Sequence, residues 1–202
     1  MKTGWTMAAL GAASLALLPQ PALAQASQAP ASAAQESGNP SSATYSMGEI
    51  LRAADGALGE GAEGLGKLVE GIFADLGEPN AYIVGGEGGG ALVVGLRYGK
   101  GTLYSKVEGE RTVYWTGPSI GPDVGGDASR SFTLVYNLND TDEIFQRFPA
   151  VEGKIYFVGG VSANYHQRGN VILVPIRLGA GWRLGANVGY LKYSRNRRLL
   201  PF

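Results

Sequence analysis

The chain of 202 residues contains no cysteine and a single histidine, His166. The absence of cysteine excludes disulfide bonds, a thiol nucleophile and cysteine-ligated metals. One histidine cannot supply the three or four nitrogen or sulfur ligands of a zinc site, so we expect no metal. The polar residues around it, Tyr165, Gln167 and Arg168, lead us to interpret His166 as part of a hairpin tip.

Long apolar runs and an excess of charge are also absent. No run of about 18 apolar residues is present that could cross a membrane as a helix. The 17 basic side chains balance the 17 acidic ones, so nothing indicates a nucleic-acid partner.

The N-terminus has the pattern of a cleavable signal peptide. Lys2 provides a positive start, residues 5–18 form a short apolar core, and Ala22-Leu23-Ala24 is a small-x-small cleavage site. We expect cleavage after Ala24 and a periplasmic protein. Residues 25–46 are rich in Ala, Ser, Gln and Pro, which predicts a disordered tether.

Residues 47–79 have helical periodicity. Apolar side chains recur three and four positions apart at Leu65, Leu68, Val69, Ile72, Phe73 and Leu76. This spacing predicts an amphipathic helix from Gly64 to Leu76, ended by Gly77 and Pro79. Glycines weaken the preceding half, where we expect a looser helix.

From Asn80 onward the apolar period becomes two. Runs rich in Val, Ile, Thr and Tyr lie between glycine, asparagine and proline turns: 91–98, 102–107, 111–115, 131–138, 155–164, 171–178 and 183–193. We predict a mainly β fold for residues 80–202, a small antiparallel barrel of about 8–10 strands or a sandwich. Asp140 and Glu143 form a capping-box-like pair, so a short helix is expected near 141–148, before Pro149.

The segment "YIVGGEGGGALVVGLRYGKG", residues 82–101, contains a formal match to the dinucleotide-binding pattern G-x-G-x-x-G/A. Such a site needs a helix after the glycines, whereas an alternating strand follows here. We therefore expect no nucleotide and no other cofactor. Glycine in a strand allows sharp bends, so we predict that Gly89→Val or Gly160→Val lowers stability. Turns do not explain Glu87, which makes it our first candidate for a role beyond the fold.

No arrangement of nucleophile, base and acid is recognisable. No serine lies in a G-x-S-x-G elbow, and the oxygen-rich residues 137–143 are better explained by helix capping than by calcium binding. Asp123 and Asp127, with Arg130 nearby, are typical of a turn with an ion pair. The sequence assigns no catalytic residue, and we expect that the protein is not an enzyme.

The strings "VYWTGPSIGPDVGGDASR", "DEIFQRFPAVEG" and "LGANVGYLKYSRNRR" resemble the alphaproteobacterial envelope integrity protein A family, long catalogued as a domain of unknown function. The resemblance covers about residues 80–202. It implies a periplasmic, roughly ten-stranded β-barrel that supports envelope integrity without known enzymatic activity. The order around Trp115-Thr116-Gly117-Pro118 is more faintly similar to SYLF lipid-binding modules.

Three hypotheses follow. The first is a non-enzymatic periplasmic protein, expected to be monomeric, that binds an envelope component. The second is a lipid- or glycan-binding module, because aromatic residues accompany a basic tail; those aromatics are Tyr98, Tyr104, Tyr114, Trp115, Trp182, Tyr190 and Tyr193. The third is an outer-membrane barrel ending at Phe202, although Pro201 and the arginines before it disfavour a final membrane strand. The candidate ligand surface comprises Glu87, Trp115, Asp123, Asp127, Arg130, Arg195, Arg197 and Arg198.

Overall fold

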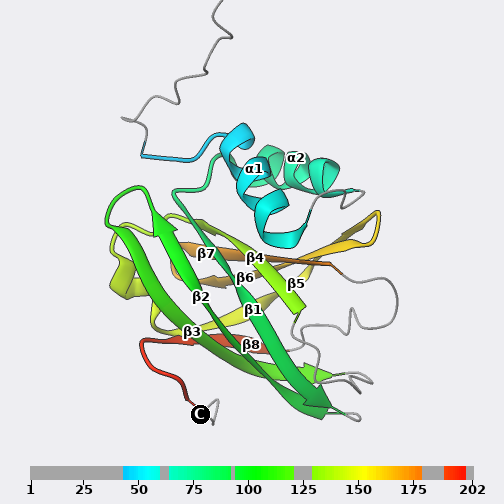
Figure 1. Cartoon of the computed structure of the whole chain (residues 1–202), viewed down its shortest axis with the longest axis vertical. Coiled ribbons are helices and arrows are strands. Elements are labelled where there is room, and N and C mark those ends of the chain that lie inside the picture. The colour runs from blue at the N-terminus through cyan, green and yellow to red at the C-terminus, as the bar shows by residue number, and fades with distance from the viewer. Residues whose placement is uncertain (1–42, 60–63, 92–93, 121–128, 179–188, 199–202) are drawn as a thin grey trace, which may run out of the picture. The chain divides into compact units, whose positions relative to one another are not determined.

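The computed structural model describes residues 43–59, 64–91, 94–120, 129–178 and 189–198 (Figure 1). The expected signal peptide and almost all of the expected tether lie outside these residues. The helices are α1 (Met47–Leu58), α2 (Leu65–Leu76) and the 3-10 turn η1 (Thr141–Ile144). The strands are β1 (Ala81–Ala91), β2 (Val94–Ser105), β3 (Gly109–Ile120), β4 (Ser129–Tyr136), β5 (Arg147–Val158), β6 (Val161–Arg168), β7 (Val171–Leu178) and β8 (Tyr190–Ser194).

Within the described residues, eight strands form a closed antiparallel barrel in the order β1-β2-β3-β8-β5-β6-β7-β4. The mainly β prediction is confirmed, and eight is the lower limit of the predicted number rather than the ten that the resemblance implied. Closure pairs β1 with β4, so the first strand has neighbours on both sides. A closed barrel leaves no free sheet edge.

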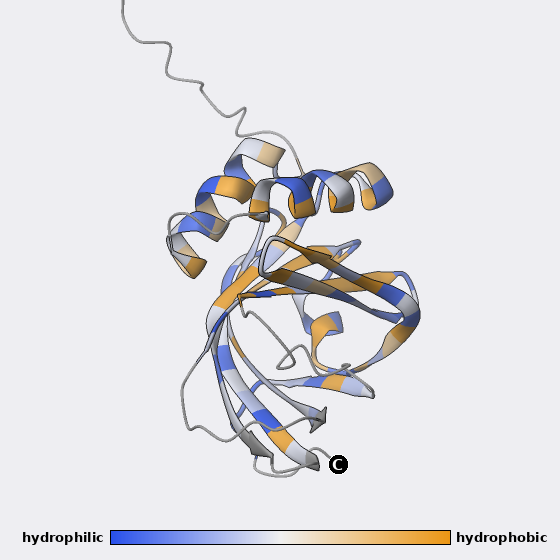
Figure 2. Cartoon of the chain, turned by 90° about the vertical axis from the view of Figure 1, so that its right-hand side faces the viewer, coloured by the Kyte–Doolittle hydropathy of each residue, from blue (hydrophilic) through white to orange (hydrophobic). Residues whose placement is uncertain are grey.

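Alternation along the strands separates two apolar clusters. Side chains on the inner face fill one part of the barrel, among them Ile83, Leu103 and Leu173. On the outer face of β4, β6 and β7, alternate residues such as Phe132 and Ile176 pack against both helices. Figure 2 shows the apolar side of the helices turned toward the strands. The helices therefore cover the barrel from outside and do not plug it.

Local sequence explains both helices. The expected helix from Gly64 to Leu76 is α2, with Gly64 as N-cap and Gly77 as C-cap. The preceding helix is well defined, because Ser46 and Glu49 form a complete capping box at the start of α1. No helix in the described part of the chain is long and apolar enough to cross a membrane.

Two predicted segments differ from the structure. The helix expected near 141–148 is only the single turn η1, because Phe148 is buried in the barrel as a residue of β5. Asp140 does cap this turn, and its carboxylate accepts from the Asp142 amide. The run at 155–164 is two strands, because Gly159 and Gly160 both have positive φ and form the turn between β5 and β6.

Candidate functional site

Glu87 lies on the inner face of β1 and is only 4% exposed. Its carboxylate accepts a hydrogen bond from Trp115 Nε1 at 2.7 Å and two from Arg177, from Nε at 2.8 Å and from a terminal nitrogen at 3.0 Å. Arg97 Nε lies 3.5 Å from the same carboxylate. We call these four residues the Glu87 cluster. It joins four strands, β1, β2, β3 and β7, inside the barrel.

Two glycines beside Glu87, Gly85 on the same strand and Gly99 opposite it on β2, create space for Trp115. A Cβ on Gly99 would lie 2.0 Å from Trp115 Cε2, and one on Gly85 would lie 2.7 Å from Trp115 Cη2. The indole therefore lies directly against the bare inner face of β1 and β2. Only glycine at these positions lets the indole nitrogen reach Glu87.

The two arginines determine the protonation of Glu87. Burial alone would raise the pKa of this carboxyl group, but the charges of Arg177 and Arg97, with the hydrogen bonds, lower the pKa to about 2. In turn Glu87 raises the pKa of Arg177 against the opposing effect of burial. Glu87 is thus an anion whose oxygens already accept hydrogen bonds, which is unsuited to a general base.

His166 is not at a hairpin tip as expected. It lies on β6 with its side chain inside the barrel, 1% exposed, and Nδ1 is 3.3 Å from the carbonyl oxygen of Phe148. Because a carbonyl only accepts, Nδ1 carries the proton and Nε2 is an acceptor, without a partner among the described residues. Burial, and then the charge of Arg177, lowers the pKa of His166 to about 4.

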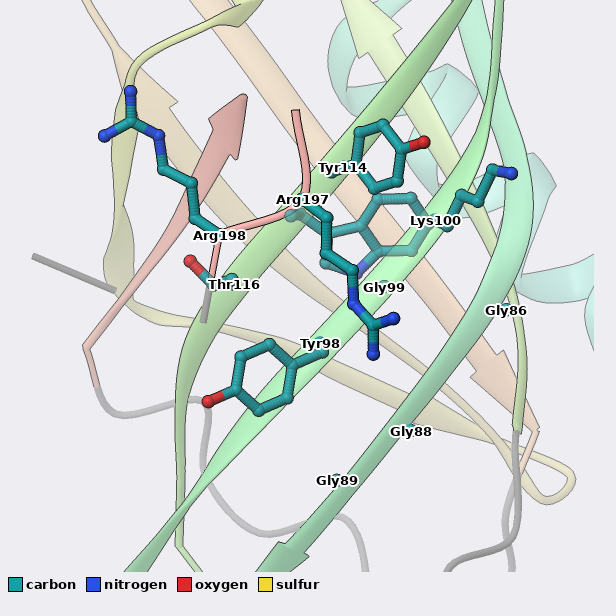
Figure 3. Close-up of a pocket in the computed structure, with 11 residues that line it drawn as sticks. Gly86, Gly88, Gly89, Tyr98, Gly99, Lys100, Tyr114, Thr116, Arg197 and Arg198 are labelled. Atoms are coloured by element: carbon teal, nitrogen blue, oxygen red, sulfur yellow. The ribbon is translucent and has the colours of Figure 1, made fainter. Parts of the chain in front are cut away.

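A groove of about 490 Å³ lies on the outer side of β1, β2 and β3. Gly86, Gly88 and Gly89 of β1 and Gly99 of β2 form its floor, with Trp115 beneath Gly99. The side chains that border it are Tyr98, Lys100, Tyr114, Thr116, Arg197 and Arg198. Figure 3 shows Tyr98 and Tyr114 over their strands, Arg197 reaching over them from the segment after β8, and the neighbouring stretch of β1 without side chains.

The glycines of β1 fall into two groups. Inward-facing Gly85 and Gly89 are required by packing, because a Cβ on either would lie 2.4–2.5 Å from a backbone oxygen of β2. Outward-facing Gly86 and Gly88 are not, since a Cβ there would meet nothing nearer than 3.9 Å. Neither of the outward pair has a positive φ. Packing and backbone conformation therefore explain the first group and leave the second unexplained.

The groove is bordered by positive charge. Lys100 lies 5.8 Å from the centre of the Tyr114 ring, and Arg197 and Arg198 are exposed on the segment after β8. That segment is held by Arg195, which pairs with Asp142 at 2.7 Å and lies over the ring of Phe145.

The structure places the candidate residues predicted from the sequence in different parts of the molecule. Glu87 and Trp115 come together, but inside the barrel. Arg197 and Arg198 border the groove, and the exposed Arg130 is opposite Gly86 in the β1–β4 register. Arg195 anchors the tail, and Asp123 and Asp127 lie outside the described residues.

The sequence reasoning missed Arg97, Arg177 and Lys100. Each lies in an alternating strand whose neighbours are apolar or glycine, and an arginine on the inner side of such a strand could have suggested a buried partner for Glu87. The two outward glycines were not distinguished from the inward ones, because the alternation of a strand does not say which face is crowded.

These features define a small antiparallel β-barrel with a buried ionic cluster and an external cationic groove. The chain belongs to the envelope integrity protein A family, whose model matches residues 43–202. This match confirms the resemblance and extends it to α1 and α2.

A solved structure, described as a beta-barrel-like, uncharacterized protein from Brucella abortus, is 44% identical with a TM-score of 0.74. The alignment covers 80% of this chain and 100% of that one. Among curated proteins the comparison found no match.

Proposed function

We propose that this chain is a non-enzymatic periplasmic protein that supports envelope integrity by binding an anionic envelope component in the outer groove. The family name and the signal-peptide pattern support a role at the envelope. The observation that carries the binding role is the bare floor at Gly86 and Gly88, which packing does not require, beside Lys100, Arg197 and Arg198. An anionic ligand that approaches the backbone closely would explain both the bare glycine floor and the positive charges beside it.

The Glu87 cluster supports a structural role for the barrel interior. Its carboxylate accepts from Trp115 and Arg177, and its pKa of about 2 leaves it a poor proton acceptor. Buried, fully paired charges of this kind fix the positions of strands. The binding role therefore rests on the outside of the barrel.

The covered outer face disfavours an outer-membrane barrel. A membrane barrel presents apolar residues to lipid on its outer side. Here the apolar outer residues of β4, β6 and β7, such as Phe132 and Ile176, contact α1 and α2 instead. The groove face of β1, β2 and β3 carries Lys100 and Thr116.

The test fills the groove without disturbing the fold. Gly88→Leu places a side chain in open space on the groove floor. Gly71→Leu on α2 is the matched control, since a Cβ there also meets nothing within 4 Å and lies away from the groove. Each variant replaces the native chain in the producing cells, and survival in deoxycholate is compared at equal protein levels.

We expect cells without the chain and cells with Gly88→Leu to lose resistance alike, and cells with Gly71→Leu to keep it. Full resistance with Gly88→Leu would overturn the proposed function. The thermal midpoint of each purified variant is measured in parallel, so that a loss of resistance is assigned to the groove only where folding is unchanged.

A further inference from the structure

We infer that the ligand of the outer groove is an acidic sugar chain, whose units carry carboxylate groups. This inference rests on the proposed function and specifies the ligand of the same groove. Three features of the lining carry it: the kind of apolar surface, the flat floor and the sign of the charge.

The apolar surface of the groove is aromatic and backbone, not aliphatic. Among the described lining residues there is no Val, Leu, Ile, Met or Phe. The apolar part of the lining consists of the half-buried rings of Tyr98 and Tyr114, the buried indole of Trp115 and the glycine floor. An acyl chain is held by apolar side chains that remove it from water. This lining offers an acyl chain no such wall, so the groove does not suit the tail of a lipid.

A sugar ring suits the same surfaces. The C–H groups on one face of a pyranose are weakly positive and lie well against the negative face of an aromatic ring. Gly86 and Gly88 leave β1 flat beside these rings, so a ring-shaped ligand can approach the backbone closely. The volume of about 490 Å³ lies within the range of ~300–1,000 Å³ typical of ligand sites and accommodates a short segment of such a chain.

The charge selects an acidic sugar over a neutral one. Lys100, Arg197 and Arg198 border the groove, and no Asp or Glu is among its described lining residues. Arginine presents paired donors that match the two oxygens of a carboxylate or phosphate. Arg130, opposite Gly86, extends the positive charge beyond one end of the glycine floor.

The experiment is calorimetric titration of the mature chain with a probe of defined chemistry. The probes are a short polyguluronate, a neutral malto-oligosaccharide of equal length, phosphatidylglycerol vesicles and inorganic phosphate. We expect binding of the polyguluronate only, weakened at least tenfold by Gly88→Leu and by the double variant Arg197→Ser/Arg198→Ser. Gly71→Leu, and Arg52→Ser/Lys67→Ser on the helices, are the matched controls and should retain the affinity.

The possible results separate the inference from the proposed function. Equal binding of the neutral sugar or of inorganic phosphate, or no binding of the polyguluronate, overturns the acidic-sugar inference. If the vesicles bind instead and Gly88→Leu abolishes that binding, the groove has a lipid ligand and the proposed function stands. Full deoxycholate resistance of cells carrying Gly88→Leu would refute the proposed function itself, whatever the titrations show.

Discussion

At the scale of single residues, Glu87 connects the strands that build the polar part of the barrel interior. Its two oxygens accept from Trp115 and Arg177 and lie close to Arg97, so the buried charge is neutralised and hydrogen-bonded. An isolated carboxylate at this position would be strongly unfavourable. The arginines, on β2 and β7, would likewise lose their counter-charge if Glu87 were removed.

Glu87→Gln should lower the free energy of unfolding by roughly 3 kcal/mol, because it leaves Arg177 charged and without its buried anion. Urea unfolding monitored by tryptophan fluorescence measures the change. The double variant Glu87→Gln/Arg177→Met is the control, and it should recover part of the loss because it removes the uncompensated charge. A single variant as stable as the native chain would show that the cluster contributes nothing to folding.

His166 predicts an acid-dependent loss of stability. Its pKa is lowered from 6.5 to about 4, chiefly by burial and then by Arg177. Between these values the unfolded chain binds a proton that the folded chain does not, so the unfolding free energy falls as the pH drops. The full loss is about 3 kcal/mol.

Urea unfolding at pH values between 7 and 4 measures this slope, and His166→Gln should remove it. The window above pH 4.5 is the most informative for His166. Glu87 and Glu49 each have a pKa lowered from 4.5 to about 2, so their contribution to the unfolding free energy is lost only as the pH falls below 4.5. An unchanged slope in His166→Gln would contradict the assignment.

At the scale of elements, glycine has two different roles in β1 and β2. Inward glycines let strands and Trp115 approach, and outward glycines leave a bare floor. Gly99→Ala should therefore destabilise the protein, because the new Cβ would lie 2.0 Å from the indole, whereas Gly88→Ala should change the unfolding free energy little. Thermal unfolding of both variants gives the comparison, and equal midpoints would refute the division into two groups.

The predicted substitutions at Gly89 and Gly160 now have separate physical reasons. A Cβ on Gly89 would lie 2.5 Å from the Leu96 carbonyl oxygen, and Gly160 has a φ of +80°. The sequence suggested that both shape the barrel, but not that one acts through packing and the other through a turn.

Periodicity predicted the strand content and α2 because alternation and helical spacing are local properties. It could not place His166, since a polar residue on a barrel strand has the same local pattern whether it faces water or a buried arginine. The short η1 has a similar cause. The sequence at 141–148 favours a helix locally, but burial of Phe148 within the barrel extends β5 instead. An arginine at an inward strand position suggests a buried partner for Glu87, but one sequence does not say which arginine it is, so the pairing of Glu87 with Arg177 required the structure.

At the scale of the whole molecule, the helices and the barrel share a hydrophobic core. Ile50 and Ile72 are buried together with Phe132 of β4, and Glu49 of α1 pairs with Lys106 at 2.9 Å. The sequence had placed the helical segment and the barrel in separate regions. The common core indicates that the stability of the barrel depends on the helices, because without them the outer apolar faces of β4, β6 and β7 would contact water.

Ile72→Ala tests this dependence within the intact chain. Ile72 is 1% exposed, so its truncation should cost about 2–5 kcal/mol, whereas Gly71→Ala on the exposed side of the same helix should not destabilise. A chain beginning at Asn80 should show no cooperative transition at the native midpoint, as followed by circular dichroism and light scattering. If that shorter chain unfolds cooperatively at the same temperature, and Ile72→Ala is neutral, then the barrel carries its own stability and the helices are an appended layer.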